Sequence, residues 1–206
     1  DSSHLNYDFQ VKGNYLNDNF NTTESKLKFT GNFDKFFDNF HLGMDVGYTY
    51  IKHQAWQDTL NDNLLKVSPW IARYGDDWRI QGGINFFNDI INGKGKVRIY
   101  PTARMEYDMV SQYFIPYGGL DGKLTLNSYE EITEVNPFVI PGLNVKKSNY
   151  NMIFYAGLRG HLGPSTFYNA RMEYTFFDDM YFFVNEIAST DSAGNQFDVV
   201  YGNGEK

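Results

Sequence analysis

The sequence contains no cysteine, no long hydrophobic run and no cluster of basic residues. Without cysteine the chain has neither disulfide bonds nor thiolate metal ligands, so its stability depends on packing and hydrogen bonds. A membrane-spanning helix needs roughly 18 consecutive apolar residues, and the sequence has no such segment. Neutralising nucleic-acid phosphates requires a basic face, so the net charge of −7 argues against a nucleic-acid partner.

Aromatic residues, in contrast, are abundant: the chain has 16 Tyr and 18 Phe among its 206 residues. Disordered chains are poor in aromatic residues, so this composition indicates a folded protein. The length suits one large β domain. We therefore expect residues 1–206 to form a single architectural unit.

Apolar and polar residues alternate along much of the chain, beginning with residues 5–15. A period of two places the two kinds of side chain on opposite faces of a strand. The same pattern returns in residues 27–33, 40–50, 78–86, 99–107, 152–160 and 168–176. Strands at this spacing predict an all-β protein, an antiparallel up-and-down β-barrel or partial barrel of about nine to eleven strands.

The alternation is interrupted at four places. Gln54–Asn63 is polar and predicts a longer loop, and the strand that follows is expected to break at Pro69. Asn92–Gly95 predicts a hairpin turn. Residues 127–149 contain Pro137 and Pro141, which lack the donors that a strand ladder needs, so we expect an ordered irregular excursion there.

Alternation does not reveal which face is buried. A soluble barrel hides its apolar face inside, whereas a membrane barrel turns its apolar face to lipid and keeps a polar interior. Tyr and Phe residues gather near the ends of the apolar faces, as Tyr7 and Tyr15 do, which favours interfacial girdles and a lipid-facing surface. A high β propensity of these residues is the simpler explanation. The polar faces carry charged residues that we take as lumen-facing or ligand-contact candidates: Lys12, Lys28, Arg104, Glu106, Arg171 and Glu173.

Three segments resemble a known family. Asn136–Val145, Tyr155–Gly160 and the aromatic hairpin that ends at Phe182–Asn185 are similar to the barrel portion of TonB-dependent-receptor-like outer-membrane proteins of Bacteroides-type bacteria. The resemblance implies a large antiparallel barrel in the outer membrane and nutrient import driven through a plug domain. Neither a plug nor a TonB-contacting segment is present, and the chain closes on Tyr201–Lys206 rather than on a strand ending in an aromatic residue.

From this resemblance we expect a partial barrel with further strands beyond Lys206. Its partners would be outer-membrane lipid and a small solute or carbohydrate. Unpaired edge strands would also permit self-association.

Chemistry-bearing motifs are few. His4, His41, His53 and His161 are not at metal-ligand spacing, and no G-x-S-x-G nucleophile elbow occurs. We therefore expect a non-enzymatic protein with no metal, cofactor or catalytic residue. An envelope lipid hydrolase would need His41 or His161 beside a hydroxyl nucleophile such as Ser165.

Two functional hypotheses follow. The first is an outer-membrane barrel segment for solute passage or nutrient uptake. The second is a soluble extracellular or periplasmic β-barrel or sandwich that binds a ligand and has buried aromatics and a charged exterior. Carbohydrate is one such ligand, because Trp56, Trp70, Trp78 and the 113–117 stretch could stack on sugar rings.

Overall fold

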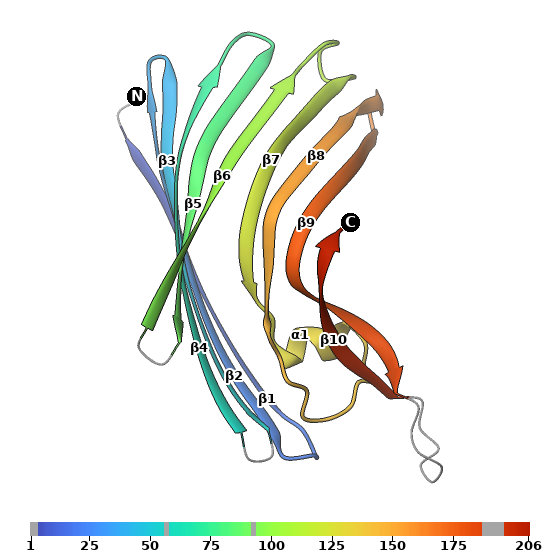
Figure 1. Cartoon of the computed structure of the whole chain (residues 1–206). Helices are drawn as coiled ribbons and strands as arrows, with labels where there is room; N and C mark the ends of the chain where they lie inside the picture. The colour runs from blue at the N-terminus through green and yellow to red at the C-terminus, as the bar shows by residue number, and fades with distance from the viewer. Residues whose placement is uncertain (1–3, 56–57, 92–93, 187–195) are drawn as a thin grey trace.

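The fold is a single ten-stranded antiparallel sheet whose strands follow one another in chain order (Figure 1). The computed structural model describes residues 4–55, 58–91, 94–186 and 196–206. The strands are β1 (Leu5–Asn17), β2 (Thr22–Phe37), β3 (Phe40–Ala55), β4 (Asp58–Tyr74), β5 (Trp78–Ile91), β6 (Lys94–Tyr107), β7 (Ile115–Leu126), β8 (Lys147–Gly163), β9 (Thr166–Glu186) and β10 (Gln196–Glu205). The expected all-β, up-and-down architecture is confirmed. In the described residues hydrogen bonds do not close the sheet, and β1 and β10 form its two edges.

The described residues contain one helix, α1 (Tyr129–Val135), and no helix long and apolar enough to cross a membrane. The helix lies in the irregular excursion, inside the curve of the sheet (Figure 1). Its short length explains why no helical period is visible in the sequence. The helix does have a capping signal in the sequence, Ser128 followed three residues later by Glu131. In the structure the Ser128 hydroxyl accepts a hydrogen bond from the Glu131 backbone N–H at 3.2 Å.

Strand pairing keeps each set of alternating side chains on one face of the sheet. Lys12 lies opposite Lys28, and Val11 lies opposite Phe29, in a β1–β2 ladder without a register shift. Because directly opposed residues project to the same side, the polar sets of neighbouring strands form one continuous face. This face is the concave one, since Asn14 and Glu24 hydrogen-bond to α1 from it.

The convex face is apolar and exposed. Val11 is 68% exposed, Met105 54% and Met172 81%, although they lie on three different strands. The residues that follow them in the sequence, Lys12, Glu106 and Glu173, are charged and project from the concave face. The sheet therefore shows its hydrophobic side to its surroundings.

Two details of the sequence-based prediction are wrong. The expected loop at Gln54–Asn63 is mostly strand, because β3 runs to Ala55 and β4 begins at Asp58. Pro69 does not break β4. It pairs with Met44 of β3, and only the β4–β5 pairing is interrupted, between Val67 and Trp70. Proline has no backbone N–H to donate, so the pairing with β5 is interrupted here, whereas the pairing with β3 and the strand itself continue. The predicted turn at Asn92–Gly95 includes residues 92–93, which lie outside the described residues.

The ladder that joins β6 to β7 is short, and we call it the β6–β7 constriction. Only Ala103–Glu106 pair with Tyr117–Leu120. Toward the end of the sheet that holds α1, which we call the α1 end, β7 and β8 fold over the concave face of their neighbours. The Tyr100 hydroxyl of β6 reaches Asn149 of β8 at 2.5 Å. An apolar core fills the space between these layers: Ile51, Leu64, Phe87, Tyr100, Leu124 and Leu126.

Candidate functional site

All six charged residues predicted from the sequence lie on the concave face, but in two separate groups. Lys12 and Lys28 face each other on β1 and β2. The other four lie at the end of the sheet opposite α1, where Arg104 forms an ion pair with Glu106 and Arg171 Nη2 lies 2.8 Å from Glu173 Oε2. The structure therefore brings together the predicted acid–base pairs and leaves the two lysines apart from them.

Two further arginines, one in contact with Glu106 and one opposite it in the ladder, were not among the residues predicted from the sequence. Arg159 Nη2 of β8 lies 2.7 Å from Glu106 Oε2, and Arg79 faces Glu106 across the β5–β6 ladder. We call Arg79, Arg104, Glu106 and Arg159 the arginine patch. Both missed residues occupy polar positions of the alternation, so the pattern could have indicated them. The pattern could not indicate the Arg159–Glu106 contact, because it joins β8 to β6 across the intervening β7.

Two tyrosines lie flat beside the arginine patch because glycines leave room for them. An added Cβ at Gly157 would lie 2.4 Å from Tyr117 Cζ, and one at Gly119 would lie 2.6 Å from the Tyr155 hydroxyl. The Arg171 guanidinium stacks over Tyr155, 4.2 Å from the ring centroid. The concave face here is a layer of guanidinium groups and phenol rings.

A polar hollow of about 220 Å³ adjoins this layer. Its charged lining residues are Asp45, Lys66, Arg104 and Asp121, so its charges balance. Asn85 Nδ2 donates to Asp121 Oδ1 at 3.0 Å, which ties β5 to β7 across the hollow. The hollow can hold water or a polar group, but it has no excess charge of either sign.

At the α1 end, residues 127–146 form an inward-folded segment that is anchored to β2. Glu24, which is 2% exposed, accepts hydrogen bonds from the backbone N–H groups of Tyr129 (2.7 Å) and Glu130 (3.2 Å). A carboxylate at a helix N-terminus satisfies free donors and interacts favourably with the helix dipole. Lys26 of β2 also forms an ion pair with Glu131.

The other side of the inward-folded segment packs against β9 and β10. Its buried cluster consists of Tyr129, Ile132, Val139 and Leu143, with Phe183, Phe197 and Val199 packed against it. The Phe197 N–H donates to the Phe138 carbonyl, and the Ile140 N–H donates to the Phe197 carbonyl, both at 2.9 Å. The segment therefore spans the interior from β2 to the edge strand β10.

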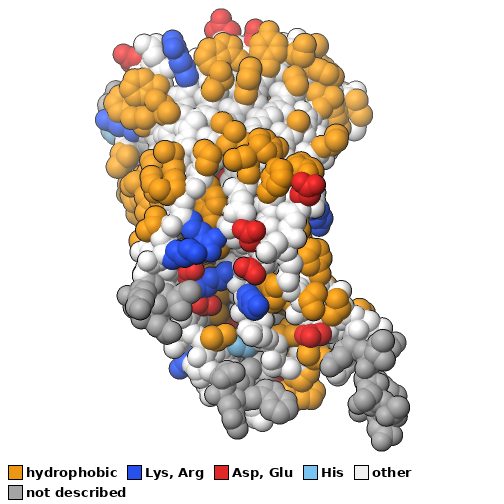
Figure 2. All heavy atoms as spheres, viewed as in Figure 1, with side chains coloured by type: hydrophobic (Ala, Val, Ile, Leu, Met, Phe, Trp, Pro, Cys, Tyr) orange, Lys and Arg blue, Asp and Glu red, His pale blue; other side chains and the backbone are white. Residues whose placement is uncertain are grey.

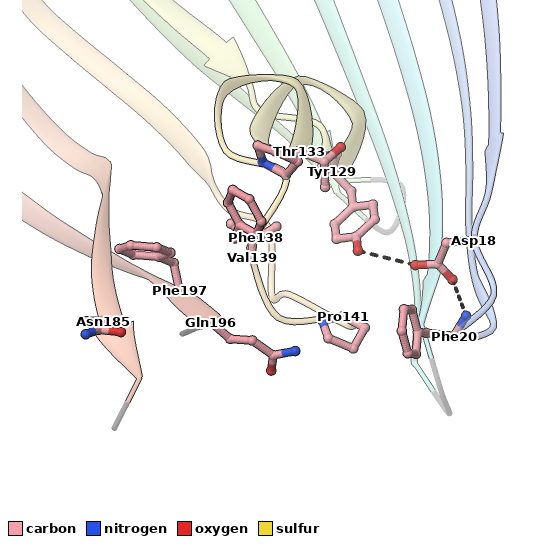
Figure 3. A pocket seen from close by; sticks show the side chains of 11 residues that line it. Asp18, Phe20, Tyr129, Thr133, Phe138, Val139, Pro141, Asn185, Gln196 and Phe197 are labelled. Atoms are coloured by element: carbon pink, nitrogen blue, oxygen red, sulfur yellow. Dashed lines mark hydrogen bonds between the residues drawn. The ribbon is translucent and has the colours of Figure 1, made fainter. Parts of the chain in front are cut away.

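A pocket of about 750 Å³ opens between this segment, the β1–β2 turn and β10 (Figure 3). Phe20 and Phe197 stand on opposite sides of it, and Tyr129 lines it from α1. Burial, together with the nearby Asp18 carboxylate, raises the pKa of Tyr129 to about 12. The phenol stays neutral at ordinary pH and donates to Asp18 Oδ2 at 3.3 Å.

His41 and His53 contact side chains of neighbouring strands. His41 Nε2 lies 2.8 Å from Asp34 Oδ2, His41 Nδ1 lies 3.1 Å from the Tyr74 hydroxyl, and the ring stacks on Phe36. His53 lies beside Glu24. Within the described part of the chain, neither His41 nor His161 is hydrogen-bonded to a serine hydroxyl. Nor do three His, Asp or Glu side chains gather there in a way that could hold a metal ion.

The two described tryptophans, Trp70 and Trp78, lie on opposite faces of the sheet and do not form one sugar-binding platform. Trp70 lines the polar hollow of the concave face. Trp78 pairs with Tyr107 and thus lies on the convex face. Trp56 lies outside the described residues.

The chain matches no protein-family model, no curated protein and no solved structure. Its function is therefore inferred from the geometry of the concave and convex faces.

Proposed function

We propose that this chain forms part of the wall of an outer-membrane β-barrel that serves solute passage or nutrient uptake. In this proposal the convex face contacts lipid and the concave face lines a narrowed, polar interior. The protein acts without catalysis, as a segment of a TonB-dependent-receptor-like barrel. Lipid of the outer membrane is then its main partner.

The observation that carries the proposal is the inverted distribution of polarity. Asp89 is 3% exposed and lies on the concave side, 2.6 Å from Lys147 Nζ. Met172, on the convex side, is 81% exposed. A water-soluble protein buries its aliphatic side chains and exposes its charges. Membrane barrels do the opposite, because lipid surrounds the outer face.

The exposed apolar surface extends around the sheet. Its aliphatic and aromatic members include Leu5, Phe9, Val11, Leu42, Met44, Leu65, Ile71, Ile80, Ile84, Val97, Ile99, Met105, Phe154, Met172 and Tyr174. Figure 2 shows hydrophobic side chains over the upper part and both sides of the molecule, and a group of charged side chains near the middle of the view. Soluble monomers rarely expose contiguous apolar patches larger than a few hundred Å².

The inward-folded segment supports a role in controlled passage. It is held by β2 on one side and by β10 on the other, so it reduces the open space on the concave side of the sheet at the α1 end. An ordered irregular segment inside a barrel is tolerated because its backbone groups find partners in the protein. Only solutes that fit beside this segment would pass.

One observation favours the second candidate, a soluble ligand-binding β domain. The pocket of about 750 Å³ is large enough for a small ligand and is lined mostly by aromatic and other apolar side chains. That candidate also predicts a charged exterior, and the convex face is apolar instead. The barrel wall is therefore the better-supported function.

Quenching of tryptophan fluorescence by brominated lipid tests the proposal. Single Trp probes replace Met44, Met105 and Met172 in turn, with the native Trp residues changed to Phe and the protein refolded into bilayers. A Trp at Lys28, on the concave face, is the matched control. We expect strong quenching at the three methionine positions and weak quenching at Lys28. A water-soluble, β-rich sample without quenching would refute the proposal.

A further inference from the structure

We propose that the arginine patch binds an oxyanion, a carboxylate or phosphate group of the solute, on the concave face. This inference rests on the proposed function, because it assigns a chemical class to the solute that the barrel would take up. It starts from a charge imbalance. Arg104 and Arg159 form ion pairs with Glu106, and Arg79 lies opposite Glu106 in the β5–β6 ladder. With three arginines and one carboxylate, the arginine patch has an excess of two positive charges.

The neighbouring acids have other partners, among them Asp108, whose carboxylate accepts a hydrogen bond from the Gln112 backbone N–H. Glu173 is paired with Arg171, and Asp121 accepts hydrogen bonds from Asn85 and from the Gly122 backbone N–H. Asp121 and Asp45 line the polar hollow, beside Lys66 and Arg104. An anion would therefore sit over the guanidinium groups of Arg79 and Arg159, away from the two aspartates.

The arginines also have unused donors. The Nε atoms of Arg79, Arg104 and Arg159 are buried and have no hydrogen-bond acceptor among the described residues. Among the described side chains, Arg79 donates only to the neutral Gln81 amide, at 3.0 Å, and its guanidinium lies 5.2 Å from the Tyr74 ring centroid. A buried donor without an acceptor is unfavourable. A small shift of these side chains around an oxyanion would supply the missing acceptors.

The geometry fits oxyanions in particular. Guanidinium groups are planar forks that bind carboxylate and phosphate through two parallel hydrogen bonds. The side chains of Arg104 and Arg159 are 42% and 36% exposed, so an anion in the interior could reach them. Glu106, at 8% exposure, holds Arg104 and Arg159 in place before the ligand arrives.

Isothermal titration of the refolded protein with citrate and, separately, with inorganic phosphate tests the inference at low ionic strength. We expect saturable binding of at least one of these probes. Arg79→Gln should raise its dissociation constant at least about tenfold, the loss of one charge-assisted pair. Lys12→Gln removes the same charge from the same face at a distant strand and should change the constant less than about twofold.

Each outcome has a distinct meaning. The stronger-binding probe tells carboxylate from phosphate recognition. Absence of saturable binding of both probes, or equal weakening by Arg79→Gln and Lys12→Gln, would overturn the inference. The bromolipid measurement on the same preparation separates the two proposals: quenching without anion binding refutes only the oxyanion site, whereas loss of quenching refutes the barrel wall itself.

Discussion

Glu24 anchors the start of α1, and with it the inward-folded segment, to β2. Its buried carboxylate accepts two backbone N–H groups of α1 and lies 3.4 Å from His53 Nδ1. Hydrogen bonds to a charged group contribute about 1.5–3 kcal/mol each. Nothing in the local alternation of β2 distinguishes Glu24 from the other polar positions, so the sequence could place it on the concave face but not beneath α1.

Replacing Glu24 by Ala tests this anchoring role. We expect Glu24→Ala to lower the free energy of unfolding by about 2–4 kcal/mol, because it leaves buried α1 donors without their acceptor. Denaturant unfolding in detergent micelles, followed by circular dichroism, measures the change. Glu134→Ala, at an exposed position of α1, is the control and should change the free energy by less than about 0.5 kcal/mol. Equal losses in the two variants would contradict the role given to Glu24.

At the scale of elements, the short β6–β7 ladder determines how the two halves of the sheet meet. Gly119 lies in this ladder, and a Cβ there would be 2.2 Å from the Ala103 carbonyl oxygen. Because that oxygen belongs to the backbone, the strands would have to separate. Gly82, on the convex face of β5, has no atom within 4 Å of its hypothetical Cβ.

We therefore expect Gly119→Ala to destabilise the protein by about 1–3 kcal/mol, as overpacking commonly does. Gly82→Ala should be neutral or slightly stabilising, because alanine loses less backbone entropy than glycine. Thermal unfolding of the two variants in the same detergent makes the comparison. A Gly119→Ala protein as stable as Gly82→Ala would show that the strands at the constriction are not in close contact.

Elements with a clear period of two were predictable from the sequence, and the constriction was not. Residues 5–15 and 27–33 alternate without exception apart from glycine, so their strands and faces follow from the pattern alone. The fold of β7 over β6 depends on a register shift between Asp121 and Lys123 and on contacts between distant strands. Helix α1 was also missed, although Ser128 and Glu131 have the spacing of a capping box.

At the scale of the whole molecule, the open sheet has two different edges. β1 pairs only with β2 among the described residues, whereas the edge of β10 is partly covered by residues 138–140 of the inward-folded segment. Exposed edges of long strands favour pairing with further strands. We propose that further strands complete the wall at these edges, or that a second copy pairs there.

The central claim is that the convex face contacts lipid while the concave face contacts water. Because the chain has no native cysteine, single cysteines can be introduced without background and spin-labelled. Neighbouring residues on opposite faces form matched pairs: Val11 with Lys12, and Met172 with Arg171. In reconstituted bilayers, collision rates with oxygen and with a water-soluble nickel chelate should differ within each pair. Oxygen should dominate at Val11 and Met172, and the chelate at Lys12 and Arg171. Chelate-dominated collisions at Val11 and Met172 would contradict the assignment of the convex face to lipid.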